Sequence, residues 1–466
     1  MQISWNGTAI PAREGDTVAD ALLRHGIRAI GTTRKRHRPL GYSGSFVKGI
    51  LAEVDGVPNV RLDQRPATNG LRVQSQNVWP GPKLDLLKFA RLVPAKFVRG
   101  GFEHPRWLPS GTARFERWEA LMSFLAGEGR LSPEPPARTT VPGEKLSTDA
   151  VVVGGGRAGS EEARRLAGLG RKVVVIARRP PADDLAAPIR TLAPFEAFGV
   201  YRGGRLIGAA PLDPDQPGVV IETSELVLAT GRRSVPPVVA GNDLPGVMDA
   251  PTALRLAERD VDLGRIVVVG TGAETSLAAR LRELGQTVAI VSTITMLERI
   301  VGRGAVAAVD VGRRIACETL VHAGPWVADP NLPFQASANG RIRLGAEALP
   351  PHVRVIGSAA LPDEPVHVGS LADARHAAIC PCMDVMGAEI LDLMAAGMTH
   401  VEELKRQTSC GMGPCQGLPC WELLRALMRK ASDGLYGDDR PSHRGPRRGL
   451  TVAQAAGLDG LVEPQQ

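Results

Sequence analysis

The run DAVVVGGGRAG occupies residues 149–159 and leads into a polar, helix-forming segment. Its first five residues predict a buried strand. Gly154, Gly156 and Gly159 have the spacing at which a tight turn, the approach of a pyrophosphate to a helix N-terminus and helix-on-strand packing each need a glycine. An apolar run at residues 173–176 supplies the next strand at the required distance, so the segment predicts a Rossmann unit.

This unit lacks the acidic side chain that usually binds the adenosine ribose. Dinucleotide-binding domains usually carry an Asp or Glu at the end of the second strand, and here that position is Ala177, followed by Arg178 and Arg179. We therefore expect either altered ribose recognition, with Arg178 as the contact, or a vestigial pocket.

A second glycine-containing turn lies inside the first unit. The run GRIVVVGTGAET at residues 264–275 and the strand pattern at residues 288–291 predict another Rossmann-like unit, nested between the halves of the first. Its third motif position is Thr275 instead of glycine, and Ser292 stands where an acid is usual after the second strand. These departures favour a structural insertion over a working NAD site, so NAD is not expected as a cofactor.

Four of the six cysteines form two close pairs late in the sequence. Cys380 and Cys382 form a C-x-C pair, and after 32 residues Cys415 and Cys420 form a C-x4-C pair. Two such pairs flanked by short helical patterns resemble the bacterioferritin-associated-ferredoxin (BFD) type of domain, in which four thiolates hold a [2Fe-2S] cluster. The resemblance makes these four cysteines the candidate metal ligands.

Two other uses of the cysteines remain open at this point. Their even number allows disulfides, but the N-terminus lacks a basic region followed by an apolar core, so we expect a reducing compartment, the cytoplasm. A tetrathiolate zinc site is the second alternative, although zinc-binding pairs usually have C-x2-4-C spacing. Cys317 and Cys410 are expected to be non-ligands.

The first 80 residues have the pattern of a ferredoxin-like β-grasp unit. Hairpins are predicted around residues 3–7 and 52–56, with a helix over residues 17–23. The segment cannot hold a thiolate-ligated cluster, because the first cysteine of the chain is Cys317. Its basic stretch at residues 34–39 is expected to have a structural or docking role, or to bind a flavin phosphate at a subunit boundary.

The run TSCGMGPCQG at residues 408–417 closely resembles a string near the C-terminal end of the α subunits of heterotetrameric amine and imino-acid oxidoreductases. This family includes sarcosine oxidase, opine oxidase, proline dehydrogenase and hydrogen cyanide synthase. The resemblance covers about residues 1–430. It implies an α/β protein with a glutathione-reductase-like two-dinucleotide-binding fold, an N-terminal ferredoxin-like β-grasp module and a C-terminal small helical [2Fe-2S] domain.

Two further segments resemble the flavin-contacting strands of this family. Residues 225–231 resemble the second such strand and its turn, and residues 353–358 resemble the last, with Ser358 where the family usually has an Asp. The resemblance implies FAD as a cofactor, although two of the family's acids are missing. The implied flavin contacts are Gly154, Gly156, Arg157, Ala158, Gly159, Arg178, Ala229, Thr230, Gly231, Gly357 and Ser358.

The chain is expected to divide into six parts. The predicted divisions are a cysteine-free ferredoxin-like module at 1–80, a linker at 81–147, a FAD-type Rossmann domain at 148–255 and 330–375, an inserted NAD-like domain at 256–329, a BFD-like [2Fe-2S] domain at 376–432 and a basic tail at 433–466. We expect the tail to be flexible and solvated, with a partner subunit as its candidate contact, because its basic run is rich in Pro, Gly and Ser.

The resemblance places substrate oxidation on another chain. It implies an electron-transferring α subunit of a dehydrogenase or oxidase for amino acids, opines or other secondary amines. The implied partner is a D-amino-acid-oxidase-like β subunit; further small subunits and an FMN at the subunit interface are additional candidates. No catalytic residue is assigned to this chain, since neither G-x-S-x-G nor H-E-x-x-H occurs in it. The alternatives are an NAD(P)H-dependent flavin/[2Fe-2S] reductase and a non-catalytic scaffold.

Composition argues against two other classes of partner. The net charge is +7, but only 4% of the residues are aromatic and the basic residues are spread among acids, so nucleic acid is not expected. No apolar run approaches the ~20 residues that span a bilayer, so a membrane is not expected either.

Overall fold

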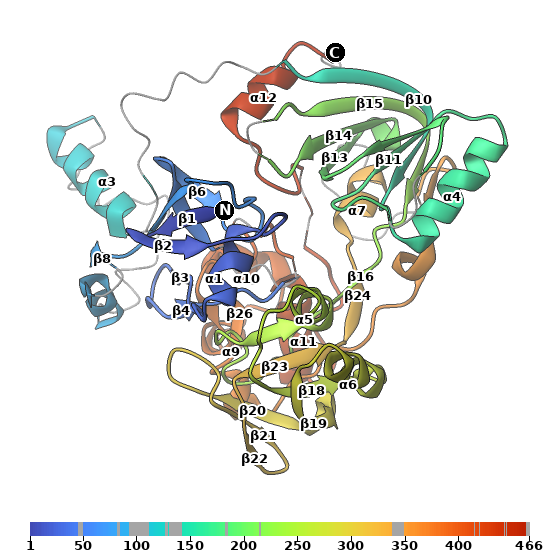
Figure 1. The fold of residues 1–466 in the computed structure, drawn as a ribbon. Coiled ribbons are helices and arrows are strands. Elements are labelled where there is room, and N and C mark those ends of the chain that lie inside the picture. The colour runs from blue at the N-terminus through green and yellow to red at the C-terminus, as the bar shows by residue number, and fades with distance from the viewer. Residues whose placement is uncertain are drawn as a thin grey trace. The chain divides into compact units, whose positions relative to one another are not determined.

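The fold is that of a computed structural model of the 466-residue chain (Figure 1). The chain forms two compact units, each assembled from three stretches of sequence: unit 1 from Met1–Pro135, Ser234–Pro325 and Val366–Asp438, and unit 2 from Pro136–Arg233, Trp326–Pro365 and Asp439–Gln466. The described residues are 1–44, 50–81, 84–92, 111–125, 129, 142–181, 185–213, 216–337, 349–413, 415–418, 420–441, 443 and 445–462.

Unit 2 is built on one seven-stranded sheet with the order β12-β11-β10-β15-β14-β13, in which β25 also pairs with β15. Strands β10, β11, β12, β15 and β25 run parallel to one another. β14 runs antiparallel to β15, and β13 runs antiparallel to β14. The strands are β10 (Glu144–Val153), β11 (Val173–Ile176), β12 (Ile189–Leu192), β13 (Phe195–Tyr201), β14 (Leu206–Pro211), β15 (Val219–Leu228) and β25 (Val353–Val355).

The Rossmann turn of unit 2 forms where the sequence predicts it. β10 ends at Val153, and helix α4 spans Arg157–Gly168 and packs beside the sheet (Figure 1). Valine side chains cover both faces of the central strands, as is typical of a parallel sheet buried on both sides. Ala163 and Leu166 lie on the buried face of α4, because residues three apart share one side of a helix.

The first part of unit 1 is a β-grasp module with the sheet order β2-β1-β7-β5-β6. Its helix α1 (Val18–Arg24) begins with a capping box between Thr17 and Asp20, which satisfies two of the otherwise unpaired backbone N–H groups. Its strands are β1 (Gln2–Trp5), β2 (Thr8–Pro11), β5 (Leu51–Val54), β6 (Val57–Arg61) and β7 (Arg72–Ser75), with the small pairs β3 (Gly31–Thr32) and β4 (Pro39–Leu40), and β8 (Pro80–Gly81) and β9 (Leu84–Asp85).

The second part of unit 1 is the inserted Rossmann-like unit. A parallel sheet with the order β17-β23-β18-β19 carries α5 and α6, and a three-stranded antiparallel sheet, β20-β21-β22, follows. The elements are β17 (Val247–Asp249), α5 (Ala250–Ala257), β18 (Arg265–Gly270), α6 (Glu274–Glu283), β19 (Thr287–Thr293), β20 (Leu297–Val301), β21 (Ala308–Val311), β22 (Arg314–Ala316) and β23 (Thr319–Ala323).

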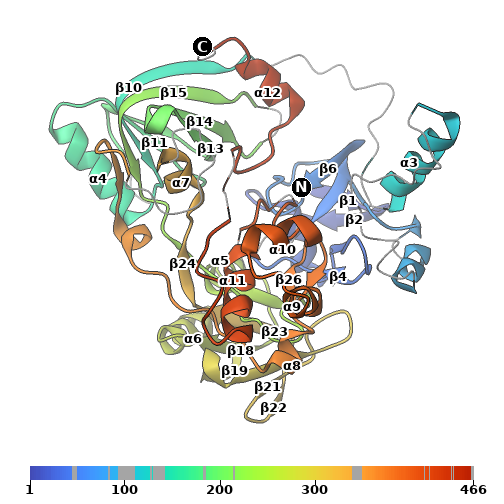
Figure 2. The ribbon, with the colours of Figure 1, turned by 180° about the vertical axis from the view of Figure 1, so that it is seen from behind.

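The third part of unit 1 is a small helical domain around a short β-hairpin. Figure 2 shows α9, α10 and α11 gathered at β26. The elements are α8 (Leu371–Ala374), β26 (Ala378–Cys380), β27 (Val385–Met386), α9 (Gly387–Ala395), α10 (Val401–Thr408) and α11 (Cys420–Ala431). These helices confirm the helical patterns that the sequence shows between and after the cysteine pairs.

The structure describes several further short helices and strands. They are η1 (Leu86–Leu92), α3 (Ala113–Leu125), η2 (Arg202–Gly204), β16 (Arg232–Ser234), η3 (Ile294–Met296), β24 (Trp326–Ala328), α7 (Asn331–Ser337), η4 (Gly357–Ala360) and α12 (Val452–Leu458). Among the helices that the structure describes, none combines the length and the apolar character needed to cross a bilayer.

The basic run after residue 439 packs on unit 2, although its composition predicts a solvated tail. Arg447 pairs with Glu196 at 2.7 Å and with Asp329 at 2.5 Å, and Arg448 donates to the Pro211 carbonyl at 2.8 Å. His443 is also buried. The arginines are ordered because buried acids of distant strands face them, which the composition of the run alone does not reveal.

Candidate metal centre and nucleotide-binding turn

Four cysteine thiols converge in the helical domain. Cys380 ends β26, Cys382 lies in the following turn, Cys415 lies in the loop after α10, and Cys420 begins α11. The Sγ–Sγ distances are 3.6 Å for Cys380–Cys382, 3.1 Å for Cys382–Cys415 and 3.7 Å for Cys415–Cys420. The Sγ atoms of Cys380, Cys382 and Cys420 lie within 4.8 Å of one another. The structure thus brings together all four predicted ligands.

The chemistry of this donor set fits an all-thiolate metal centre. All four side chains are buried, and all four are free thiols in the structure. The neighbouring Cys382 thiol, and then the other thiols, hold the pKa of Cys380 well below its usual value. The Cys380 side chain and burial instead hold the pKa values of Cys382 and Cys420 well above theirs. Adjacent thiolates repel in a buried site, so a bound cation is what allows all four to ionise.

A fifth thiol lies beside the four. Cys410 is fully buried, and its side chain is hydrogen-bonded with that of Cys380, which raises the pKa of Cys410 well above the usual range. Neither Cys410 nor Cys415 is among the three thiols that meet within ligand distance of one another, so this grouping does not separate the two. The assignment of Cys410 as a non-ligand stays a prediction. Cys317 lies apart, in the core of the inserted unit, where burial raises its pKa to about 11.

The loop that carries Cys415 needs its glycines. Gly411 has φ of +72°, and a Cβ there would lie 2.3 Å from the Trp421 ring. Gly417 has φ of +79°, and a Cβ there would lie 1.8 Å from Nε1 of the same ring. The backbone N–H of Gly411 donates to Sγ of Cys380 at 3.3 Å. A backbone donor at this distance stabilises negative charge on the sulfur.

The glycine turn of unit 2 has the shape of a dinucleotide cradle. Gly154 has φ of +121°, and a Cβ there would lie 2.1 Å from the Ala229 carbonyl oxygen, while a Cβ on Gly159 would lie 1.9 Å from the Gly154 carbonyl oxygen. At Gly156, the N-cap of α4, a Cβ would meet no atom within 4 Å. The turn is therefore closed where it packs and open where an anion would approach the helix.

The other predicted flavin contacts gather at the same edge of the sheet. β15 lies between β10 and β25, so the residues that follow these parallel strands come together. A Cβ on Gly231 would lie 3.7 Å from Oγ of Ser358, and a Cβ on Gly357 would lie 2.7 Å from Cβ of Ala158. The cradle fits a dinucleotide phosphate by shape, whereas Ala177 is buried and supplies no carboxylate for a ribose. Individual flavin contacts, including those of Arg157, Arg178 and Thr230, stay predictions.

The turn of the inserted unit differs from that of unit 2. Oε2 of Glu274, in the first turn of α6, accepts the backbone N–H of Gly272 at 2.7 Å. A carboxylate of the chain itself therefore bonds an amide that a nucleotide phosphate would use at such a turn. This geometry favours the interpretation of the inserted unit as structural.

Histidines far from the thiols bond to neutral groups or to a buried acid. His322 Nδ1 lies 2.6 Å from the Ser234 hydroxyl, and His352 Nε2 lies 2.8 Å from the Gly203 carbonyl. Sequence reasoning missed one pair: His37 Nδ1 lies 3.1 Å from Oδ2 of Asp85, and both side chains are buried in the β-grasp module. A separation of 48 residues leaves no local pattern that could have revealed it.

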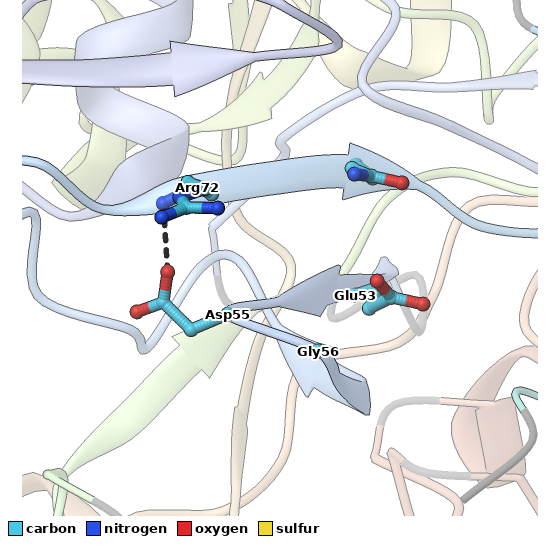
Figure 3. A pocket seen from close by; sticks show the side chains of 5 residues that line it. Glu53, Asp55, Gly56 and Arg72 are labelled. Carbon is cyan, nitrogen blue, oxygen red and sulfur yellow. Dashed lines mark hydrogen bonds between the residues drawn. The ribbon is translucent and has the colours of Figure 1, made fainter. Parts of the chain in front are cut away.

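A pocket of about 530 Å³ lies on the sheet of the β-grasp module (Figure 3). The Arg72 backbone N–H donates to Oδ1 of Asp55 at 3.0 Å at its rim. None of the predicted site residues lines this pocket, whose lining is Glu53, Asp55, Gly56, Arg72 and Gln74.

Two segments match known domain families. Residues 1–78 match the family described as a 2Fe-2S iron-sulfur cluster binding domain, and residues 378–430 match the BFD-like [2Fe-2S] binding domain. The second match contains all four converging cysteines and favours a [2Fe-2S] cluster over zinc. The first contains no cysteine, so the β-grasp module has the fold of that family without thiol ligands.

Similar proteins were found by sequence and by structure. The chain is 27% identical over 342 residues to the alpha subunit of sarcosine oxidase from Rhizobium meliloti, covering 63% of this chain and 34% of that protein. It is 34% identical over 95 residues to the A-type subunit of opine oxidase from the same species, covering 20% of each. The chain thus spans about a third of the length of the sarcosine oxidase relative.

One solved structure has the same overall fold. The L-proline dehydrogenase of P. horikoshii matches with a TM-score of 0.69 at 18% sequence identity, over 97% of this chain and 96% of that one. The match confirms the predicted fold class, a flavoprotein-type α/β fold joined to a β-grasp module and a small helical domain. The two sequence relatives support the resemblance given by the sequence: the chain is similar to the alpha subunit of sarcosine oxidase and to part of an opine oxidase subunit.

Proposed function

We propose that this chain is the electron-transferring α subunit of an oxidoreductase that contains flavin and a [2Fe-2S] cluster. Its substrate would be an amino acid, an opine or another secondary amine, oxidised on a D-amino-acid-oxidase-like β subunit. The observation that carries the proposal is the convergence of four buried thiols inside the segment that matches a BFD-like domain. The names of the relatives, which are subunits of sarcosine oxidase and opine oxidase, support the substrate class and the multisubunit assembly.

The residues of this chain would hold and insulate the redox groups. Cys380, Cys382, Cys415 and Cys420 would ligate the cluster, which would supply one-electron chemistry beside a flavin that handles two electrons. Their burial excludes water from the sulfurs, and the Gly411 N–H neutralises part of the charge on Cys380. We assign no catalytic residue and no substrate pocket to this chain.

The flavin on this chain would be FAD, bound at the β10–α4 turn. The open N-terminus of α4 at Gly156 supports a pyrophosphate there, while Ala177 in place of an acid leaves ribose recognition to other groups, with Arg178 as our candidate. An FMN at the subunit interface and further small subunits complete the proposal. We also propose a cytoplasmic location, because all six cysteines are free thiols.

The test is a cofactor and electron balance on the complex purified with its partner subunits. Iron, labile sulfide and flavin are measured per complex, and the complex is then titrated anaerobically with amine substrates while electron paramagnetic resonance follows the cluster. We expect two irons and two sulfides per chain and a reduced-cluster signal that grows with substrate. A cluster that stays oxidised while the flavins bleach would contradict electron transfer and leave the chain a scaffold.

A further inference from the structure

The basic loop of the β-grasp module lies against the loop that carries Cys382. The basic loop, Lys35–Arg38, connects β3 to β4, and the ligand loop connects β26 to β27. Both belong to unit 1. They meet at Asp384, two residues after Cys382. The Asp384 side chain is fully buried.

Asp384 accepts three hydrogen bonds from the basic loop. Its Oδ2 accepts the backbone N–H of Arg36 at 2.6 Å and that of Lys35 at 3.2 Å, and its Oδ1 accepts Nη2 of Arg38 at 2.7 Å. Arg36 Nη1 also donates to the Asp384 carbonyl at 3.3 Å. A buried carboxylate is strongly disfavoured without such partners, so the ligand loop can keep this one inside only while the basic loop is in place.

Two more acids, Asp243 and Glu389, pair with side chains of the basic loop. Arg38 Nη1 donates to Asp243, and Arg36 Nη2 donates to Oε1 of Glu389 at 2.8 Å. Glu389 lies in the first turn of α9, directly after the ligand loop and β27. Lys35 Nζ lies 3.9 Å from the same Glu389, so three cations face three carboxylates and the local charges balance.

Asp384 also fixes the backbone between the first two ligands. It has φ of +53°, in the left-handed region that non-glycine residues rarely adopt, and its N–H donates to the Pro381 carbonyl at 3.3 Å. Pro381 lies between Cys380 and Cys382. The contacts of Asp384 therefore bear on the shape of the turn that presents both thiols.

We propose that the basic loop Lys35–Arg38 is a clamp on the cluster-ligand loop, with Arg38 and Asp384 as positioning residues for Cys382. The inference rests on the proposed [2Fe-2S] cluster. It assigns to the β-grasp module, which has no cysteines, a role in positioning a cluster ligand. The clamp also sets the charge beside the cluster. Loss of the Arg38 guanidinium removes one positive charge beside Asp384 and Asp243 and disfavours the more negative, reduced cluster, whereas loss of the Asp384 carboxylate removes one negative charge and has the opposite effect.

The test compares four variants of the full chain within its purified complex. Arg38→Met removes the charge and the hydrogen bonds, Arg38→Lys keeps the charge but loses the planar fork, and Asp384→Asn removes the carboxylate. Arg255→Met is the matched control, because Arg255 pairs bidentately with Asp20 at 2.7 and 2.8 Å and links the same module to the inserted unit. The readouts are the rate of iron loss to a chelator and the cluster midpoint potential from a redox titration followed by electron paramagnetic resonance.

We expect Arg38→Met and Asp384→Asn to lose iron about tenfold faster than the wild type, because removing a group that orients a metal ligand typically weakens a metal site by at least about tenfold. Their midpoint potentials should move in opposite directions, down for Arg38→Met and up for Asp384→Asn. A tenfold change in the one-electron equilibrium constant corresponds to about 59 mV. Arg38→Lys should lie between Arg38→Met and the wild type, and Arg255→Met should match the wild type.

Two results would overturn the inference, and they are distinguishable. If the wild-type complex holds a [2Fe-2S] cluster and all four variants behave alike, the clamp is wrong and the proposed function stands. If the wild-type complex holds no cluster, the proposed function fails and the clamp fails with it. Opposite potential shifts cannot come from a general loss of folding, and Arg38→Lys tests the clamp even if Arg38→Met does not fold.

Discussion

The two candidate cofactor sites are built on opposite principles. The site in unit 1 consists of side chains, the four thiols that converge around β26 and α11. The site in unit 2 depends instead on positions without side chains. Gly154, Gly156 and Gly159 let other atoms approach the backbone closely at the start of α4. The first site should be lost when one side chain is removed, and the second when one is added.

This contrast also explains why the two sites differ in how closely they specify their cofactor. Four thiol ligands narrow the cofactor to a zinc ion or an iron–sulfur cluster, and the match to a BFD-like domain favours the cluster. A glycine turn identifies only a phosphate, and the group that would select a particular nucleotide is a side chain. In unit 2 that side chain is missing, because Ala177 occupies the position of the ribose-binding acid.

The largest effect is expected when a ligand is removed. Cys415→Ala should abolish the cluster, because three thiolates cannot complete the coordination of two irons. Iron and labile sulfide in the purified complex should fall to the background of the assay, and the visible absorption of the cluster should vanish.

Cys410→Ala is the matched control for this change. It removes a thiol that is equally buried and is hydrogen-bonded with Cys380 but lies outside the predicted ligand set. It should keep the iron content of the wild type. Equal loss of iron in both variants would mean that the ligand set is misassigned.

A methyl group added to the other site should act nearly as strongly. Gly154→Ala places a Cβ 2.1 Å from the Ala229 carbonyl oxygen at φ of +121°, so the β10–α4 turn has to open. We expect unit 2 to lose more than about 2 kcal/mol of stability and its flavin, with the cluster retained. Thermal unfolding and the ratio of flavin to iron measure the two effects.

Gly156→Ala separates binding from folding at the same turn. A Cβ there meets no atom within 4 Å, so the unfolding temperature should stay near that of the wild type, within about 0.5 kcal/mol in stability. The methyl group would nevertheless stand in the path of the pyrophosphate, and flavin affinity should fall about tenfold. Unchanged flavin content would place the flavin elsewhere.

The cluster loop offers a test in which both principles meet. Gly411→Ala adds a Cβ 2.3 Å from the Trp421 ring at φ of +72°, and should cost about 2–3 kcal/mol through strain and lost packing. Gly397→Ala has φ of +95° but meets no atom within 4 Å, so it should cost only about 1 kcal/mol. Equal unfolding temperatures for the two variants would show that the contact with Trp421 does not restrain the loop.

The smallest effect concerns acid stability beside the glycine turn. Hydrogen bonds from Arg165 and then Arg354 hold the pKa of Glu162 at about 2, although burial opposes this. The folded state therefore gains stability from this carboxylate above its unfolded pKa of 4.5, and loses it as pH falls from 4.5 towards 2. Glu162→Gln should lower stability at neutral pH by under about 1 kcal/mol, and its difference from the wild type should vanish near pH 2.

Thermal unfolding at several pH values checks this prediction. Glu283→Gln is the control, because Glu283 pairs with Arg280 at 3.0 Å on the exposed face of α6. A difference between Glu162→Gln and the wild type that does not change with pH would rule out the proposed origin of the effect.

Local patterns predicted the secondary-structure elements around both candidate sites. The apolar strand before Gly154 and the helical periodicity around the cysteine pairs are properties of neighbouring residues, and the structure has β10, α4, α9 and α11 at these places. The polar run after Gly159 suggested that the helix begins there. In the structure it begins at Arg157, so the motif glycine Gly159 lies in its first turn.

Contacts between distant segments could not be predicted. Arg38 and Asp384 are separated by 346 residues, and neither belongs to a periodic pattern that demands the other. Arg447 and Glu196 are separated by 251 residues. The composition of the run around Arg447, rich in Pro, Gly and Arg, is typical of a solvated segment, and it does not show that buried acids of unit 2 pair with this arginine. These ion pairs depend on which surfaces the fold brings together, and the sequence contains no local signal for that.

The division into two units has a consequence for biosynthesis. The chain passes from one unit to the other at residues 135, 233, 325, 365 and 438, so neither unit is continuous. Unit 2 needs Arg447 to neutralise Glu196 and Asp329, and that arginine leaves the ribosome only after all of unit 1 has been synthesised. Neither unit can finish folding early during translation, and the incomplete chain exposes unpaired strand edges of the kind that promote aggregation.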